Sequence, residues 1–285
     1  MANTIDIRRR IRSVKNTQQI TRAMKMVAAA RLRRAQDRIV AARPYSAALK
    51  QVLASVASRV GEQDHPLLQT RDEKKILLLV VTGDKGLAGA FNTNVLKAAQ
   101  NAIQDRGWTD LQLIPIGRKA NDYFKRRSIP IRHQAVNIFQ ALGLEHGREL
   151  ATIITDDFVT GKIDAVYVVY NEFRSVISQI VNVERILPLD RPKHDEATPP
   201  IEYVYEPGPE KILSELLPRH IEFQLYRVLL DSAAAEHGAR MTAMDAATRN
   251  AGELIESLTL SYNRIRQASI TREIIEIVSG AQALD

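Results

Sequence analysis

The first fifty residues carry a hydrophobic pattern that steps alternately by four and three positions, with no glycine and no proline before Pro44. The positions in this pattern are Ile7, Ile11, Val14, Gln18, Thr21, Lys25, Ala28, Leu32, Ala35, Ile39 and Ala42. Five heptads of this kind are typical of a long helix with a coiled-coil face, because residues seven apart return to the same side of the helix. The pattern therefore predicts such a helix, which Pro44 would kink or interrupt and which Gly61 and Pro66 would end.

The C-terminal part of the chain repeats this design. Pro218 suits the first turn of a helix, and few glycines interrupt the run as far as Gly280. The apolar positions are Ile221, Leu225, Val228, Ser232, Ala235, Ala239, Thr242 and Ala246, and after a stutter Leu254, Leu258, Ser261, Ile265 and Ala268. A helix from Pro218 to Ser279 would be about 90 Å long at 1.5 Å per residue. Alanine clusters in both helices favour close approach, so we expect the two chain ends to form a thin rod.

The middle of the chain alternates between apolar runs and helical patterns. The expected strands are 74–81, 111–117, 165–173 and 175–189, and the expected helices are 94–105, 118–127 and 144–159. This alternation predicts a Rossmann-like α/β fold with a mostly parallel sheet and an antiparallel hairpin at its end. The proline-containing segment 190–200 is expected to be an exposed loop. The predicted domains are a helix over 1–60, a globular α/β domain over 61–208 and a second helix over 209–285.

The stretch VVTGDKGLAGAFNTN, residues 80–94, places three glycines between an expected strand and an expected helix. Such turns often hold phosphate, because backbone N–H groups can close on an anion at a helix N-terminus. The spacing here matches neither phosphate motif. No Gly-Lys-Ser/Thr follows a glycine after four residues, and Gly83, Gly86 and Gly89 are each three apart. The motif therefore indicates a structural turn or a protein-contact loop.

The positive charge of this protein, +7 at neutral pH, is concentrated at one end. The first fifty residues carry thirteen Lys and Arg but only Asp6 and Asp37 as acidic residues. A cationic helix of this kind suits nucleic acid, an anionic membrane surface or an acidic protein, or is simply a solvated face. No aromatic side chain, which a single-stranded nucleic-acid binder would use for stacking, occurs before Tyr45.

The composition also narrows the possible chemistry. The chain has no cysteine, which excludes disulfides, thiolate metal sites and thiol switches. No apolar run is long enough to cross a bilayer, and the helical pattern begins without a leader-like segment, which favours a cytoplasmic protein. The histidines show no metal-ligand spacing, and Asp156 and Asp157 point to different helix faces. We therefore expect no metal, no cofactor and no catalytic residue.

Four stretches of the sequence together resemble one known family. They are DIRRRIRSVKNTQQITRAMKMVAAARLRRAQ, TGDKGLAGAFN, YVYEPGP and YNRIRQASITREIIEIVSGAQAL. The sequence is similar, from end to end, to the gamma subunit of the bacterial F-type ATP synthase. The resemblance implies a non-catalytic rotor shaft, in which the two termini form an antiparallel coiled coil inside a ring of alpha and beta subunits. It also implies an epsilon subunit and a membrane ring of c subunits as partners, and peripheral attachment through them to the cytoplasmic face of the bacterial inner membrane.

The same resemblance implies which residues contact these partners. Met24 and Lys25 lie where the family's shaft passes an acidic lever loop of a beta subunit. Lys85 and Ala88 lie in a loop that faces a beta subunit near that lever, and Arg266, Gln267 and Thr271 lie where the shaft hydrogen-bonds a catch loop. Tyr203, Tyr205 and Glu206 lie in the foot, next to the c ring. Each group also has a simpler interpretation. Met24 could be a packing residue and Lys25 a solvated one. The positions 266, 267 and 271 could form only an outer polar face of the helix, and those at 203, 205 and 206 could simply close a strand before a turn.

Two other classes of function are also compatible with the sequence. One is a cytoplasmic enzyme or nucleotide-binding protein with helical arms, and the other is a basic coiled coil that binds nucleic acid. A rotor subunit should neither hydrolyse nor measurably bind ATP by itself. A nucleic-acid-binding protein would show a strongly salt-dependent affinity for DNA.

Overall fold

The computed structural model describes residues 4–57, 65–190 and 208–282, which form two compact units. The helical unit comprises the described parts of 1–28 and 241–285, and the globular unit comprises those of 29–240. Two long helices, α1 (Thr4–Ala57) and α5 (Pro209–Gln282), contribute to both units. The 74 residues of α5 correspond to about 110 Å at 1.5 Å per residue.

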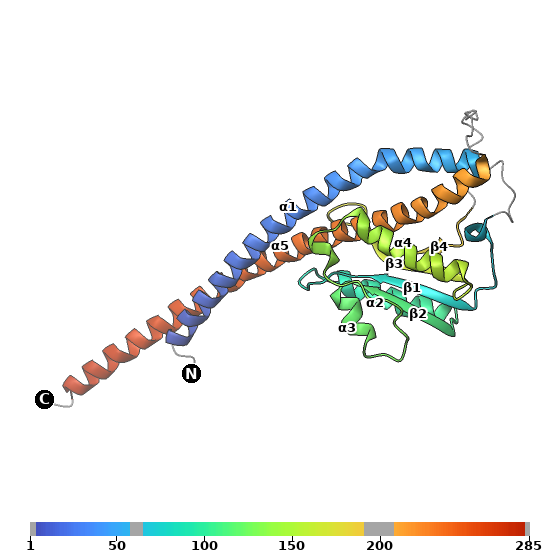
Figure 1. The fold of residues 1–285 in the computed structure, drawn as a ribbon. Coiled ribbons are helices and arrows are strands. Elements are labelled where there is room, and N and C mark those ends of the chain that lie inside the picture. The colour runs from blue at the N-terminus through green and yellow to red at the C-terminus, as the bar shows by residue number, and fades with distance from the viewer. Residues whose placement is uncertain (1–3, 58–64, 191–207, 283–285) are drawn as a thin grey trace. The chain divides into compact units, whose positions relative to one another are not determined.

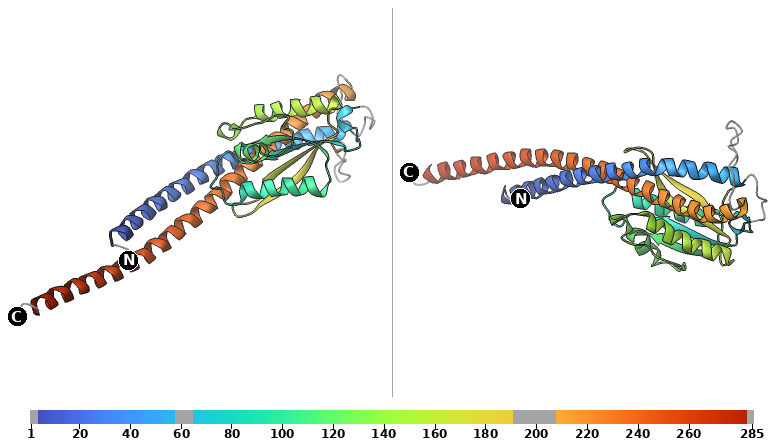
Figure 2. Two further views of the ribbon diagram at one scale, coloured as in Figure 1. Left: turned by 90° about the horizontal axis from the view of Figure 1, so that it is seen from below. Right: turned by 45° about the horizontal axis from the view of Figure 1, so that its top comes forward.

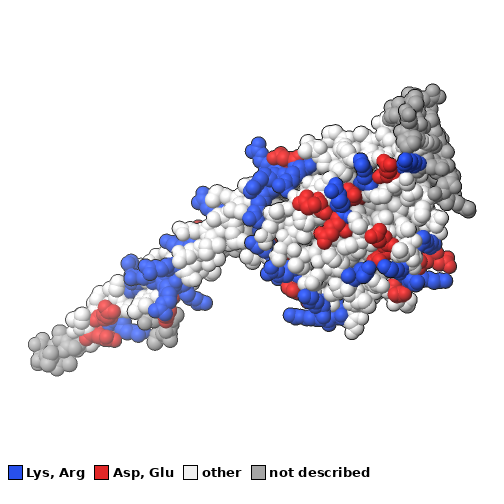
Figure 3. All heavy atoms as spheres, in the orientation of Figure 1, with Lys and Arg blue, Asp and Glu red and all other residues white. Residues whose placement is uncertain are grey.

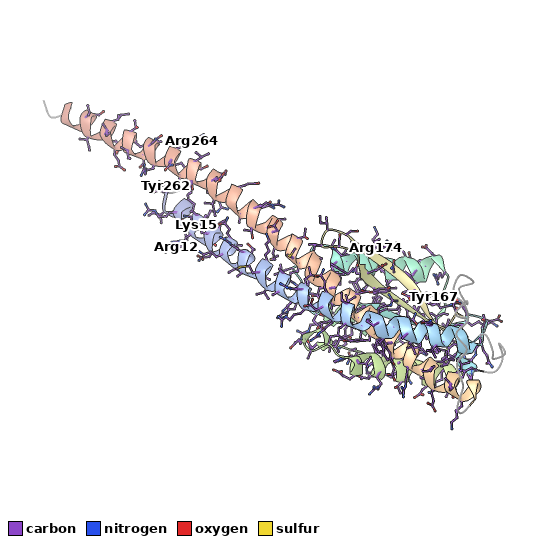
Figure 4. The ribbon with its side chains drawn as sticks, turned by 90° about the horizontal axis from the view of Figure 1, so that it is seen from above. Arg12, Lys15, Tyr167, Arg174, Tyr262 and Arg264 are labelled. Atoms are coloured by element: carbon purple, nitrogen blue, oxygen red, sulfur yellow. The ribbon has the colours of Figure 1, made fainter. Side chains whose placement is uncertain are left out.

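In the helical unit, α1 and α5 pair in antiparallel orientation. Arg8 contacts Tyr262, and further along α1 Lys25 contacts Asp245, so residue numbers rise on one helix as they fall on the other. Figure 4 shows Tyr262 of α5 beside the first turns of α1, where Arg12 and Lys15 also lie. The antiparallel pairing that the resemblance implies is confirmed for this unit.

The predicted seam of α1 is the face that is buried. Every seam position from Ile7 to Ala42 is buried or half-buried, whereas most residues between them are exposed.

The predicted seam of α5 is buried or half-buried as far as Ala239, but beyond that residue the prediction is wrong in part. The exposed side chains include Thr242, Leu254, Ser261 and Ala268. The residues that face α1 are the predicted Leu258 and Ile265, together with Met244, Thr248, Ala251, Ile255 and Tyr262, which were not predicted. The steps from Met244 onward are again four and three, so the register changes earlier than predicted and then stays regular.

The globular unit is built on a four-stranded sheet with the order β2-β1-β3-β4 (Figure 1). The strands are β1 (Lys75–Val81), β2 (Asp110–Ile116), β3 (Ala165–Phe173) and β4 (Gln179–Leu187). β1 pairs in parallel with β2 and β3, and β3 pairs with β4 as an antiparallel hairpin. The predicted mostly parallel sheet with a terminal hairpin is therefore confirmed. The central strand β1 is buried on both faces, which explains its uninterrupted apolar sequence.

Helices cover both faces of this sheet, as the views of Figure 2 show. One face packs against α2 (Phe91–Asp105) and α3 (Arg118–Phe124). The other face packs against α4 (Leu144–Val159) and against the parts of α5 and α1 in this unit. Two short 3₁₀ helices, Pro66–Leu68 and Ile138–Gln140, lie in the connections. The first half of α5 is thus part of the core of the globular unit.

Two prolines lie within the long helices and do not end them. α1 continues through Pro44, although Figure 1 shows it bending in its second half. Beyond that proline, Tyr45 stacks on Phe223 of α5 with ring centroids 4.2 Å apart. α5 begins at Pro209, so the prediction that Pro218 opens the helix is wrong. Leu213, Leu217 and Ile221 are buried on both sides of Pro218, and this packing outweighs the lost backbone hydrogen bond.

Candidate partner-contact surfaces

The glycine-rich turn after β1 packs tightly against α5. A Cβ atom on Gly83 would lie 2.7 Å from the carboxylate of Glu236, which is buried. Glu236 accepts a hydrogen bond from Arg240 at 2.5 Å, and Arg240 also donates to the backbone oxygens of Lys85 and Gly86. Burial raises the pKa of Glu236, an effect that Arg240 partly offsets. This turn therefore serves as a contact between the sheet and α5.

The backbone of this turn is not arranged as a phosphate cradle. The N–H of Gly83 donates to the side chain of Asn92 at 2.9 Å, and the N–H of Phe91 donates to the carbonyl of Ala88 at 3.2 Å. These are groups that a bound phosphate would need. The geometry agrees with the interpretation of the motif as a structural turn.

Of the two residues predicted to contact a partner from this turn, one is on the surface and one is not. Lys85 is exposed. Ala88 is 1% exposed and packs against Phe91 and Ala235, so its side chain is part of the core. Leu87, with a positive φ of 61°, exposes its side chain instead. The surface of the turn is therefore formed by the neighbours of Ala88.

The polar positions in the seam of α1 have partners on α5 within the helical unit. The hydroxyl groups of Thr21 and Thr248 lie 2.8 Å apart. The side-chain amide of Gln18 donates a hydrogen bond of 3.4 Å to the backbone carbonyl of Thr248. Lys25 forms an ion pair of 2.5 Å with Asp245, and this hydrogen bond holds the pKa of Asp245 below its usual range. Polar pairs at seam positions fix the register of two helices. They account for the three polar residues that weaken the apolar pattern.

The other predicted contacts on the long helices differ in exposure. Met24 is half-buried, and so is Lys25. Arg266, Gln267 and Thr271 are exposed, as is every other residue from 266 to 279. Their predicted contacts with partners stay predictions. Tyr203, Tyr205 and Glu206 lie outside the described residues.

The last part of α5 also carries an apolar surface that was not predicted from the sequence. The exposed large side chains are Ile270, Ile274, Ile275, Ile277 and Val278. Ile270, Ile274, Ile277 and Val278 are spaced by four, three and one, so they lie on one side of the helix. Exposed apolar stripes of this kind mark protein-contact surfaces. The signal was present in the sequence as apolar positions that continue beyond Ala268, the last position of the predicted seam.

A half-buried polar network joins α5 to the hairpin in the globular unit, and no sequence pattern indicated it. Arg227 donates two hydrogen bonds of 2.9 Å to Glu184 of β4, which also accepts from Tyr170 at 2.9 Å and from Gln224 at 3.0 Å. Burial raises the pKa of Tyr170 to about 12. Burial alone would raise the pKa of Glu184, but Arg227, Gln224 and Tyr170 together hold it below its usual value. The network holds one face of α5 to the sheet.

Two kinds of feature are absent from the described residues: a cluster of metal ligands and a helix that could span a membrane. Within residues 4–57, 65–190 and 208–282, no three His, Asp or Glu side chains gather closely enough to hold a metal ion. No helix in the same ranges has an apolar stretch long enough to cross a bilayer.

Comparison with known proteins identifies the family. A family model described as ATP synthase matches residues 3–284. The ATP synthase gamma chain of Solibacter usitatus is 52% identical over 289 residues, with both chains fully covered. That of Chloroherpeton thalassium is 48% identical and covers all of this chain and 99% of its own length.

Solved structures show the same fold at lower identity. A chain in the central stalk and c-ring structure of the Tetrahymena thermophila mitochondrial ATP synthase has a TM-score of 0.63 at 24% identity, covering 80% of this chain and 99% of its own. A chain in the Euglena gracilis mitochondrial ATP synthase has a TM-score of 0.67 at 20% identity, covering 99% and 94%. Full-length matches at about half identity, together with this fold, establish that the chain belongs to the ATP synthase gamma chain family.

Proposed function

We propose that this chain is the central rotor-stalk subunit of an F-type ATP synthase. It carries no catalytic site of its own and couples ion translocation through the membrane c ring to ATP synthesis or hydrolysis at the beta subunits. The observation that carries the proposal is the antiparallel pairing of the two chain ends in a chain that matches the family model over residues 3–284.

The helical unit has the physical properties that a rotating shaft needs. Polar pairs such as Thr21 with Thr248 fix the register of its two helices, so a twist applied to one is transmitted to the other. Its exposed surface mixes charged and apolar side chains over many turns, which favours a series of weak contacts over one adhesive patch. In this proposal Met24, Lys25 and Lys85 face the acidic lever of a beta subunit, together with the loop around Ala88. Arg266, Gln267 and Thr271 bind its catch loop.

In this proposal the globular part of the chain contacts the membrane ring of c subunits. We propose that residues 61–208 form the foot, and that Tyr203, Tyr205 and Glu206 contact the polar loops of the c subunits. Residues 1–60 and 209–285 supply the two helices, whose parts in the helical unit form the shaft. The complex is membrane-associated, and we place this subunit on the cytoplasmic face of the bacterial inner membrane, held by the epsilon subunit and the c ring.

Affinity purification of the tagged chain from membranes tests the assignment. We expect alpha, beta, epsilon and c subunits to be recovered with it, and we expect the purified chain alone to show no ATPase activity. Recovery of the chain without these subunits would contradict the proposal. ATP hydrolysis by the isolated chain would support an enzyme instead.

A further inference from the structure

A cavity of about 400 Å³ lies in the globular unit between α1, α5, the turn after β1 and the connection that leads into α4. Its walls come from four separate segments, and their polar side chains converge on one concave space. A volume of this size is typical of a site for a small molecule.

The lining of this cavity is strongly cationic. It includes Arg31, Arg34, Arg38, Lys85 and Arg240, against the acidic Asp84 and Glu236. Figure 3 shows Lys and Arg side chains gathered over this part of α1. The excess of positive charge is concentrated in one hollow.

The two carboxylates in the lining already have partners within the protein. Glu236 is bonded to Arg240 at 2.5 Å. One oxygen of Asp84 accepts the backbone N–H groups of Arg118 and Asn137 at 3.0 and 2.8 Å. The second oxygen of Asp84 is buried without a hydrogen-bond partner among the described residues. Counted formally, five cationic and two acidic side chains give the lining a net charge of +3.

Three of the cavity's arginines lie on one side of α1, spaced by three and four residues. Arg38 donates to the carbonyl of Leu142 at 2.9 Å. Within the part of the chain that the structure describes, Arg34 makes a single long hydrogen bond of 3.4 Å, to a carbonyl of its own helix. Arg31 has no ion pair within 4.0 Å among the residues that the structure describes. Arg31 and Arg34 are exposed and so are available to an incoming ligand.

The positive potential in this space also acts on a histidine in the lining. Burial, and after it the charges of Arg240, Arg31 and Arg34, lowers the pKa of His237 to about 4. His237 is therefore neutral at pH 7 and adds no charge of its own. A ligand that brings negative charge into the cavity relieves the repulsion among these arginines.

We propose that this cavity is a binding site for a small polyanion of the phosphate class, such as a pyrophosphate or triphosphate group. Guanidinium groups pair with phosphate oxygens through two parallel hydrogen bonds, and arginines from α1 and α5 face the same space. The ligand is held by Arg31 and Arg34 and by the Lys85 side chain, while the backbone N–H of Gly83 stays with Asn92. The site goes beyond the rotor function proposed above but shares Lys85 with the beta-subunit contact proposed there.

Calorimetric titration of the purified full-length chain with sodium pyrophosphate and with tripolyphosphate tests the site. Arg31→Gln and Arg34→Gln should each raise the dissociation constant about tenfold, and the double variant about a hundredfold, because each removes a charged hydrogen bond. Glutamine is a good helix former and both positions are exposed, so the variants should fold. The isolated chain is the right preparation because no partner then covers Lys85.

The matched control is the double variant Arg22→Gln with Arg33→Gln, which removes the same charge from exposed positions of α1 outside the cavity. Its affinity should stay within about twofold of the parent, apart from the general effect of net charge. An equal loss in the control, or no binding at millimolar ligand, would overturn the proposal. An oligoglutamate peptide that binds more tightly than tripolyphosphate, and with the same dependence on Arg31 and Arg34, would assign the cavity to an acidic protein segment instead.

Discussion

At the scale of single residues, close backbone approach requires a glycine at position 117 of the globular unit. Gly117, between β2 and α3, has a φ of +87°, and a Cβ atom there would lie 2.1 Å from the carbonyl oxygen of Thr82. Thr82 in turn accepts the N–H of Ala120 at 2.8 Å, which ties the start of α3 to the end of β1. The backbone of Thr82, directly after β1, therefore leaves no room for a side chain at position 117.

We predict that Gly117→Ala destabilises the protein by about 3 kcal/mol or more, since it combines a left-handed backbone with overlap on an immobile carbonyl. Gly107→Ala is the matched control, because Gly107 also has a positive φ, of 61°, but no atom within 4 Å of its Cβ position. It should cost only about 1 kcal/mol. Urea unfolding of both variants measures the difference, and equal losses would show that overlap with Thr82 is not the cause.

His237 makes stability depend on pH. Its pKa is about 4 in the folded protein and 6.5 when its side chain is fully solvated, so the unfolded chain binds the proton first as the pH falls. The contribution of neutral His237 to the free energy of unfolding is therefore fully present above pH 6.5. It falls by about 3 kcal/mol as the pH is lowered to 4. Glu236, whose pKa is raised, acts in the opposite sense, so the informative quantity is the difference between parent and variant.

We therefore predict that His237→Gln is less sensitive to acid than the parent. Urea unfolding at pH 7 and at pH 4.5 should show a smaller loss of unfolding free energy in the variant, by about 2 kcal/mol. An identical loss in both proteins would mean that His237 is already protonated when folded, or that it is as accessible as in the unfolded chain.

At the scale of elements, α5 is held differently along its length. In the globular unit it is fixed to the sheet by the network of Arg227 with Glu184 and by apolar packing. At Gly147 of α4 the two helices approach so closely that a Cβ atom would lie 2.7 Å from the carbonyl of Glu222. Among the described residues of the helical unit, α5 packs against α1, and beyond Ile265 every described residue as far as Ser279 is exposed.

The ion pair of Lys25 with Asp245 allows its structural role to be separated from a role in partner contact. We predict that Lys25→Glu impairs ATP-driven proton pumping by the assembled enzyme, because a carboxylate would repel both Asp245 and an acidic lever. The double variant Lys25→Glu with Asp245→Lys restores the pair between the helices and serves as the control. If Lys25 contacts the lever, the double variant should stay impaired. Pumping equal to that of the parent would reduce the role of Lys25 to helix pairing.

At the scale of the whole molecule, folding and function depend on different parts of the chain. Most of the buried apolar residues belong to the globular unit, whereas residues 266–279 of α5 are all exposed. Removal of a segment that makes no internal contacts leaves the free energy of unfolding nearly unchanged. The exposed stripe of Ile270, Ile274 and Ile277 therefore indicates a function in contact with other subunits.

We predict that truncation after Ile270 lowers the melting temperature of the isolated chain by no more than about 2 °C. The same truncation should reduce the torque or the coupled proton pumping of the assembled enzyme. Thermal unfolding and pumping assays on the same variant make the comparison. A much lower melting temperature would show that the tip supports the fold, and unchanged pumping would show that the exposed stripe is dispensable.

The sequence by itself determined the periodic features of this protein. The seam of α1, the strands of the sheet and the bounds of α4 follow from the spacing of apolar residues, because burial on one side of an element imposes its period on the sequence. The family was also determined by the sequence, since its motifs extend along the whole chain. Local patterns could not reveal that α5 continues through Pro218, because flanking leucines hold that turn only once they meet the core.

Only the tertiary structure decided which side chains meet across long separations. The pairs Lys25 with Asp245 and Glu184 with Arg227, and the cluster of Arg31 with Arg240 around one cavity, join residues that are far apart in sequence. Charged residues tolerate many surroundings, so their spacing carries little information about their partners. The same holds for Ala88, whose small side chain suits a surface turn and a packed core equally well, and which the fold buries against α5.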